Sequence, residues 1–309
     1  MATDLVTPIL HCTLCLYLII PWLNAVDEEQ HWTERVRLLR KLLHPMLDRF
    51  QKICQQERID TQSFDLREAK NAICDTAFFL SEFLGLIANE ATKTKQLCFK
   101  QLKDISSGLI HLLQLFSCNC DMMEPLLNLL HSLLQALSVQ LGPEYIQRTV
   151  QVLIAATSQQ NLREALMQEE TVGYKVFHKL LKILLLIVKE SSRKLQQFTN
   201  DILDLALHNL FPVISQMNIV DLQLVFYELL STILDVRWRY FFPVSNYVNK
   251  ENAQPWNEPS SEDIEKRKSY FVAVIKALSC SLQSDELRVV KQNLQYLNSI
   301  HSKWNLYGK

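Results

Sequence analysis

The segment from Tyr174 to Glu190 constrains the fold more than any other part of the chain. Its apolar side chains recur at helical spacing and cover almost the whole circumference of the helix that they predict. A helix of this kind must be buried on several sides. It does not fit a membrane span, which needs ~18 continuous apolar residues, because the segment is interrupted by Lys175, His178, Lys179, Lys182 and Lys189. We therefore expect an inner helix of an all-α stack.

The scarcity of glycine supports the all-α interpretation. The chain has 5 Gly and 9 Pro among its 309 residues, whereas an average protein contains about 7% Gly. Sheet proteins need Gly in tight turns, and nucleotide-binding folds need Gly-rich phosphate loops. The chain also exceeds the ~250 to 300 residues that one hydrophobic core serves, which favours an elongated fold built unit by unit.

Amphipathic segments before and after this helix predict a repeating architecture. Helix pairs are expected to start near Asp121, Val172 and Asp221, at intervals of roughly 50 residues, slightly longer than HEAT or armadillo units. We predict an all-α, HEAT-like helical-repeat solenoid of stacked antiparallel helix pairs over residues 1–309, clearest over 121–309. Residues 243–262 contain three prolines and no periodic apolar face, so they predict a loop insertion.

Local signals predict several helix ends. Asp65 with Glu68 and Ser260 with Asp263 have the spacing of capping boxes. Gly142 followed by proline predicts the end of one helix and the start of the next. A bend is expected at Ser107 and Gly108, and the last helix is expected to start at Ser284 and to use Leu294, Leu297 and Ile300 as its apolar face.

Residues 5–26 are the most apolar stretch at either terminus. They lack the basic region of a signal peptide, and two prolines and a histidine interrupt them. Two alternatives stay open, a buried core helix and a membrane anchor. Cys12 with Cys15, and Cys118 with Cys120, are close pairs, but neither has a second pair at zinc spacing, so the sequence favours reduced core or junction cysteines.

Charge and motifs exclude several function classes. The chain has 32 Lys and Arg against 33 Asp and Glu, a net charge of -1, whereas a nucleic-acid binder needs a basic surplus. No GxSxG, P-loop, GxGxxG or HExxH motif is present. The sequence predicts a protein that is not an enzyme, with no catalytic residues, no cofactor and no metal site.

Three residues are candidates for binding a partner protein. Arg237 and Arg239 lie in the sequence RWRYFF, where they could face an acidic partner while the aromatic side chains anchor in the core. The alternative is an aromatic plug at a helix end, with the arginines stacked on it or bonded to carbonyl groups. Trp256, in the predicted loop, could be a docking contact or could pack against its own chain.

Four segments resemble the importin-β (karyopherin-β) superfamily, and within it an exportin: LSVQLGPEYIQ (137–147), VGYKVFHKLLKILLLIVKE (172–190), RWRYFFP (237–243) and KQNLQYLNS (291–299). The resemblance is specific from about Leu133 onward and looser before it. Members of this superfamily are long HEAT solenoids, so the resemblance implies the same fold class as the periodicity does.

The resemblance implies a nuclear export receptor that shuttles between nucleus and cytoplasm. Implied partners are a protein cargo, GTP-loaded Ran and nucleoporins, and for the member that these segments match the implied cargo is actin with profilin. Ran binding is implied mainly through N-terminal repeats that we do not expect in this sequence, and both ends are expected to be cut faces of a longer solenoid. No nucleic acid and no stable membrane insertion are expected. The alternative function is a generic helical-repeat scaffold that binds proteins without a transport role.

Overall fold

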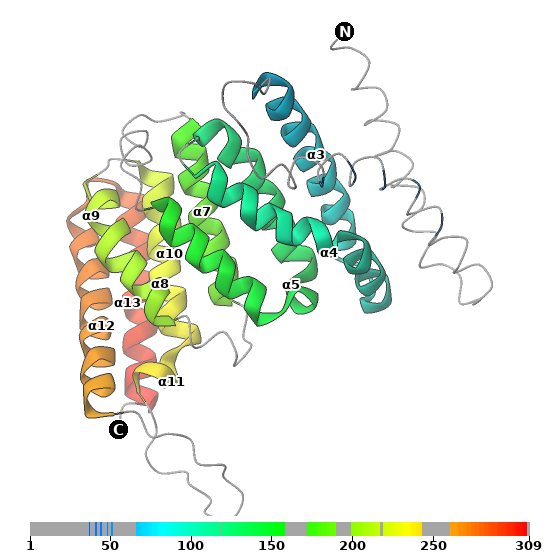
Figure 1. Cartoon of the computed structure of the whole chain (residues 1–309). Helices are drawn as coiled ribbons and strands as arrows, with labels where there is room; N and C mark the ends of the chain where they lie inside the picture. The colour runs from blue at the N-terminus through cyan, green and yellow to red at the C-terminus, as the bar shows by residue number, and fades with distance from the viewer. Residues whose placement is uncertain are drawn as a thin grey trace, which may run out of the picture. The chain divides into compact units, whose positions relative to one another are not determined.

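The computed structural model describes residues 66–117, 119–157, 172–189, 199–216, 219–242 and 260–307, with single positions 37, 41, 44, 48 and 51. Every regular element in these ranges is helical, and none of them contains a strand (Figure 1). The all-α helical-repeat class is therefore confirmed. The chain divides into two compact units, residues 1–183 and 184–309. That residues 1–309 form one solenoid segment stays a prediction.

The first unit contains helices α3 (Leu66–Ile87), α4 (Thr92–Leu115) and α5 (Cys120–Thr157). Both α3 and α4 pack against α5, and the three are coloured from blue to green in Figure 1. On α3 the buried face has the helical spacing that the sequence predicts, with Ile73, Ala77, Leu80, Leu84 and Ile87 each at most 1% exposed. The predicted capping pair before α3, Asp65 with Glu68, lies outside the residues whose side chains are described.

The sequence prediction of a break at Gly142 is confirmed. Gly142 has φ 76° and ψ 173°, a backbone conformation open to glycine but strained for other residues. Leu137, five residues earlier, is also non-helical, so α5 consists of two helical stretches on either side of a kink. Pro143 then fits the first turn of the second stretch, where its missing N–H has no helical partner to lose.

The other local predictions for this unit have mixed outcomes. The junction at 117–120 is confirmed, because Asn119 precedes α5 and its Oδ1 accepts from the N–H of Met122 at 3.3 Å. The bend expected at Ser107 and Gly108 does not interrupt the helix, since α4 stays helical through both residues. Leu109, Leu112 and Leu113 are each fully buried, so packing holds the helix together where local propensity is weak.

Helix α7 (Val172–Lys189) is the segment that the sequence places in the interior, and the prediction is confirmed. The boundary between the two units falls within it, after Ile183. Its apolar side chains are at most 8% exposed at Val176, Phe177, Leu180, Leu181, Ile183, Leu184, Leu185, Ile187 and Val188.

The second unit continues with α8 (Thr199–Asp204), the π-helical turn η2 (Leu205–Leu210) and α9 (Phe211–Ile214). The sequence predicts one helix through this region with Pro212 near its end. Pro212 has no N–H, and its ring would clash with the carbonyl four residues earlier in an α-helix. The turn before it widens accordingly: the N–H of Phe211 donates to the carbonyl of Ala206, five residues back.

Helices α10 (Val220–Val236), α12 (Ser261–Cys280) and α13 (Leu287–Tyr307) complete the second unit, and each of the three contacts the other two. The capping box at the start of α12 is confirmed. The N–H of Asp263 donates to Oγ of Ser260 at 3.1 Å, and the N–H of Ser260 donates to Oδ2 of Asp263 at 3.2 Å. Helix α12 thus takes residues 261–262 from the loop predicted over 243–262, and residues 243–259 lie outside the described ranges.

The buried face of α13 differs from the sequence prediction. Leu294 is 46% exposed, while its neighbour Asn293 is fully buried. The inward face runs through Val289, Asn293 and Ile300, at spacings of four and seven residues. Of the three residues predicted for this face, Ile300 is buried and Leu297 is half-buried, whereas Leu294 is wrong because the polar Asn293 occupies the interior position beside it.

A candidate protein-binding surface at helix α11

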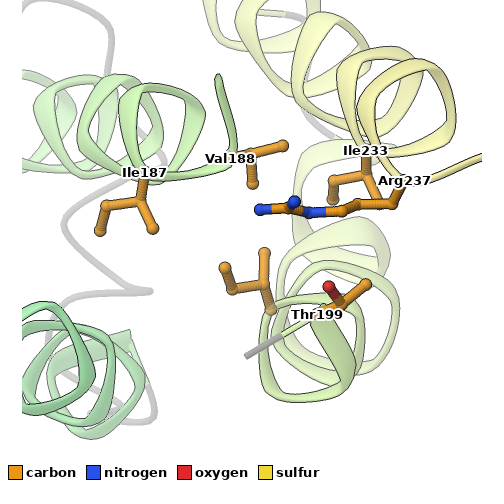
Figure 2. Close-up of a pocket in the computed structure, with 6 residues that line it drawn as sticks. Ile187, Val188, Thr199, Ile233 and Arg237 are labelled. Atoms are coloured by element: carbon orange, nitrogen blue, oxygen red, sulfur yellow. The ribbon is translucent and has the colours of Figure 1, made fainter. Parts of the chain in front are cut away.

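The residue Arg237 links α10 to the short helix α11 (Trp238–Phe241). It is only 5% exposed. Figure 2 shows its guanidinium extending toward Val188 of α7 across a small pocket. The walls are otherwise apolar apart from one hydroxyl, and comprise Ile187, Val188, Thr199, Ile202 and Ile233.

The surroundings of Arg237 favour a structural role for its charge. Burial lowers the pKa of its guanidinium, although an arginine stays protonated in proteins. Ile187 and Val188 belong to the last turn of α7, where the helix dipole is negative and stabilises a cation. The pocket measures about 10 Å³, which is close to the space of one water molecule and too small for a cofactor.

Of the other two sequence candidates, the structure describes only Arg239. Arg239 is exposed on α11, so its side chain is accessible to a partner. Trp256 lies outside the described residues. The structure thus separates the two arginines of RWRYFF into an interior and a surface position, and the proposed partner-binding role of Arg237, Arg239 and Trp256 stays a prediction.

An aromatic cluster joins α11 to α12 and α13. It consists of Trp238, Phe242, Phe271 and Trp304, and we call it the α11 aromatic cluster. Ring centroids lie 4.9 Å apart for Phe242 and Phe271, and 5.0 Å apart for Phe242 and Trp304, both pairs edge to face. Phe271 and Trp304 stack at 6.0 Å. Trp304 is 42% exposed, so the cluster is both a packing contact and part of the surface.

A polar layer lies beside this cluster. Arg267 of α12 places its guanidinium 4.6 Å from the ring centroid of Tyr240 and donates to the Tyr240 carbonyl at 3.3 Å. The Tyr240 hydroxyl donates to the side chain of Asn200 on α8, and burial raises its pKa. Arg267 and Tyr240 therefore link α11 to α12 and to α8 within this unit.

Sequence reasoning identified the α11 half of the cluster and missed Phe271 and Trp304. RWRYFF is a visible run of aromatic residues, whereas Phe271 follows a single tyrosine in α12 and Trp304 has no adjacent aromatic residue in α13. Phe271 and Trp304 come close to the RWRYFF side chains in space because α12 and α13 pack against α10 and α11. No local pattern in the sequence could have paired them with Trp238.

We searched the described residues for metal-binding groups and for membrane-spanning helices. No group of three or more His, Cys, Asp or Glu side chains within them is placed to hold a metal ion. None of the helices that the structure describes has the length and apolar character required to cross a bilayer. The residues 5–26 and the pair Cys12 and Cys15, for which a membrane or metal alternative was open, lie outside these ranges.

The region around this cluster matches a known family model. The model described as exportin-6, C-terminal TPR repeats, matches residues 234–309. Similarity extends well beyond it: exportin-6-A of Xenopus laevis is 29% identical over 292 residues, which is 94% of this chain and 25% of that protein. The chain is similar to exportin-6 over most of its length.

Other exportin-6 proteins match over the same share of the chain. Exportin-6-B of Xenopus laevis is 30% identical over 292 residues, and human exportin-6 is 26% identical over 296 residues. In both cases the match covers 94% of this chain and 25% of the relative. The chain thus spans about a quarter of the length of the curated exportin-6 relatives that it matches. These relatives are exportins, and the resemblance to an exportin that the four sequence segments indicate is confirmed.

A solved structure also matches most of the chain, but weakly. The crystal structure of an engineered protein covers 93% of this chain and 98% of its own, with 13% sequence identity and a TM-score of 0.46. A likeness at this level carries no structural conclusion.

Proposed function

We propose that the chain acts as part of a nuclear export receptor of the exportin-6 type. The observation that carries the proposal is the match of 94% of the chain to exportin-6 from frog and human. The helical-repeat fold supports it, because stacked helices present extended surfaces for protein partners. The comparison favours this function over a generic helical scaffold, since the relatives are transport receptors rather than enzymes or adaptors.

The finer elements of the proposal concern partners and location. The receptor would bind a protein cargo together with GTP-loaded Ran, contact nucleoporins and shuttle between nucleus and cytoplasm. The cargo implied by the resemblance is actin with profilin. Ran would be bound mainly by repeats outside this chain. Arg239 and Trp304 are exposed, and arginine and tryptophan are residue types that dominate protein interfaces.

A chimera tests whether the chain can perform this role. The matching quarter of human exportin-6 is replaced by residues 1–309, and the chimera is used to capture actin and profilin with Ran loaded with GTP or GDP. We expect greater recovery of actin and profilin with GTP-loaded Ran. A folded chimera that recovers the same amount of cargo with both forms of Ran would contradict the proposal.

The control is the same chimera with Leu184→Asp. Leu184 is fully buried in α7, and an unpaired carboxylate there costs several kcal/mol against a total stability of roughly 5 to 15 kcal/mol. We expect this variant to lose helical circular dichroism and cargo recovery together. An unchanged melting temperature would show that the side chain is not buried.

A further inference from the structure

We propose that a basic face of the first unit binds an acidic helical segment of a partner protein. The face consists of Lys175, Lys179 and Lys182 of α7 with His131 of α5, and we call it the α7 basic face. The inference goes beyond the proposed export function and does not depend on it.

The three lysines lie along one side of α7. Their spacing of four and then three residues places them on neighbouring turns, over about 10 Å of helix. Lys175 and Lys182 are exposed, and Lys179 is half-buried. His131, also half-buried, lies within electrostatic range of Lys179 and Lys182. Four groups that are cationic or can become so therefore face one region of the surface.

Helices α7 and α5 carry almost no acidic side chains that could neutralise these lysines. Helix α7 contains no Asp or Glu from Val172 to Lys189, and α5 contains none between Pro125 and Gly142. Glu124 is the carboxylate that acts on Lys179. The contrast is Lys70, elsewhere in the unit, which forms a 2.7 Å ion pair with Asp121. Among the described residues, no ion pair is formed by Lys175, Lys179 or Lys182.

The electrostatics of the face are unfavourable in the free chain. Burial, with Lys179 and Lys182 nearby, lowers the pKa of His131 to about 4. Burial and the neighbouring Lys182 also lower the pKa of Lys179, whereas the hydrogen bond with Asp121 raises the pKa of Lys70. Carboxylates placed over the face would offset the repulsion among the lysines and form attractive charge pairs with them. Binding of an acidic ligand would therefore be electrostatically favourable.

The arrangement fits an acidic helix better than a nucleic acid. Carboxylates at positions i, i+4 and i+7 of a second helix repeat at the same spacing as the lysines. A nucleic-acid surface needs a larger basic surplus, since its affinity comes from many phosphate contacts. The chain as a whole has a net charge of -1, and the face has three lysines.

The test uses the full chain and two synthetic helical peptides of identical composition. One peptide presents Glu at i, i+4 and i+7 on one side, and the other distributes the same Glu residues around the helix. Binding is followed by NMR of histidine labelled at Cε1, which reports the pKa of the His131 imidazole. We expect the first peptide to raise that pKa by about one unit, because a nearby carboxylate stabilises the imidazolium. The second peptide should raise it much less.

Matched variants keep the test independent of folding. Lys179→Gln with Lys182→Gln should abolish the response to the first peptide and weaken binding about tenfold, roughly the loss of two charge pairs. Lys100→Gln with Lys103→Gln on α4 removes two exposed lysines from the same unit and should leave the response unchanged. Lys179→Glu with Lys182→Glu should instead bind a peptide that has Lys in place of Glu.

Three results would overturn the proposal. They are an equal response of His131 to the two peptides, an equal loss in the Lys179/Lys182 and Lys100/Lys103 variants, and a larger response to a ten-residue oligothymidylate than to the aligned peptide. The last result would identify a nucleic-acid surface instead. Circular dichroism of each variant establishes that its helix content is unchanged.

Discussion

Tyr270 donates a hydrogen bond of 2.6 Å through its hydroxyl to Oδ1 of Asp204, a residue 66 positions earlier in the chain. The bond joins α12 to the last residue of α8. Asp204 also lies 3.6 Å from Nε2 of His208, one turn along. This carboxylate therefore connects the capped helix α12 to the irregular helix that contains the π turn.

Removing the Tyr270 hydroxyl should lower the stability of the second unit. We expect Tyr270→Phe to lower the free energy of unfolding by about 1 to 2 kcal/mol, since the acceptor is a carboxylate. Urea unfolding followed by circular dichroism measures the change. Tyr296→Phe is the control. The Tyr296 hydroxyl accepts a hydrogen bond from Gln292 within the same helix, so its removal should lower the free energy of unfolding by less. An equal loss in the two variants would contradict the role of the α8 to α12 bond.

The same bond predicts a dependence on alkaline pH. Burial, together with the bond to Asp204, raises the pKa of Tyr270 above its ordinary value of 10.0. The contribution of Tyr270 is thus complete below pH 10 and is lost as the pH rises through the folded-state pKa. In unfolding measurements above pH 10, the wild-type chain should lose stability more steeply than the Tyr270→Phe variant.

The buried amide of Asn293 is a weak point that substitution should improve. Within the described part of the chain, neither its Oδ1 nor its Nδ2 has a hydrogen-bond partner. An unsatisfied buried polar group costs about 1 to 3 kcal/mol. We expect Asn293→Leu to raise the free energy of unfolding by about 1 kcal/mol, measured by thermal and urea unfolding.

The neighbouring position supplies the control for Asn293. Leu294 is 46% exposed, so Leu294→Asn should change stability by less than about 0.5 kcal/mol. If Leu294→Asn is the more damaging change and Asn293→Leu destabilises, the inward face of α13 is the one that hydrophobic spacing suggests.

Two glycines with open surroundings should respond oppositely to alanine. Gly142 has φ 76°, and a Cβ there meets no atom within 4 Å, so any cost comes from backbone strain. We expect Gly142→Ala to destabilise the chain by about 1 to 2 kcal/mol. A Cβ at Gly85, inside α3, also meets nothing within 4 Å, and alanine there should stabilise by about 0.5 to 1 kcal/mol. If the two alanine variants shifted the melting temperature in the same direction, the result would contradict the strained backbone at Gly142.

The depressed pKa of His131 predicts a loss of stability in mild acid. The pKa is about 4 when folded and 6.5 ordinarily. Its contribution is therefore present above pH 6.5 and is lost as the pH falls toward 4. The side chain is partly exposed, so the effect should be about 1 kcal/mol after solvent screening. His131→Gln should flatten the fall in melting temperature between pH 6.5 and 4.

Much of the fold could be predicted from the sequence because two kinds of signal are local. The face of α3 and the nearly all-apolar α7 follow from the spacing of apolar residues along a single helix. The break at Gly142 and the cap at Ser260 follow from backbone and side-chain chemistry within a few residues. Each of these features forms with little information from the rest of the chain.

The features that sequence reasoning missed depend on packing between distant helices. Asn293 is interior because α13 is fixed against α10 and α12, and the hydrophobic pattern points to Leu294 instead. The sequence leaves Arg237 open between a cation that faces a partner and an arginine packed at a helix end, and only the structure shows that it is buried beside the end of α7. The partners Phe271 and Trp304 become visible only when three helices are placed together. Local propensity cannot decide such positions, since burial there is set by tertiary contacts.

The π-helical turn at Leu205–Leu210 bears on how the length of this chain can change during evolution. Such a turn contains one residue more than an α-helical turn, so losing a residue there restores regular α geometry and keeps the faces on both sides aligned. Losing a residue from α10 would instead rotate every later side chain by about 100° and turn its core face outward. Natural deletions of a single residue should therefore be tolerated before Pro212 and selected against in the uninterrupted helices.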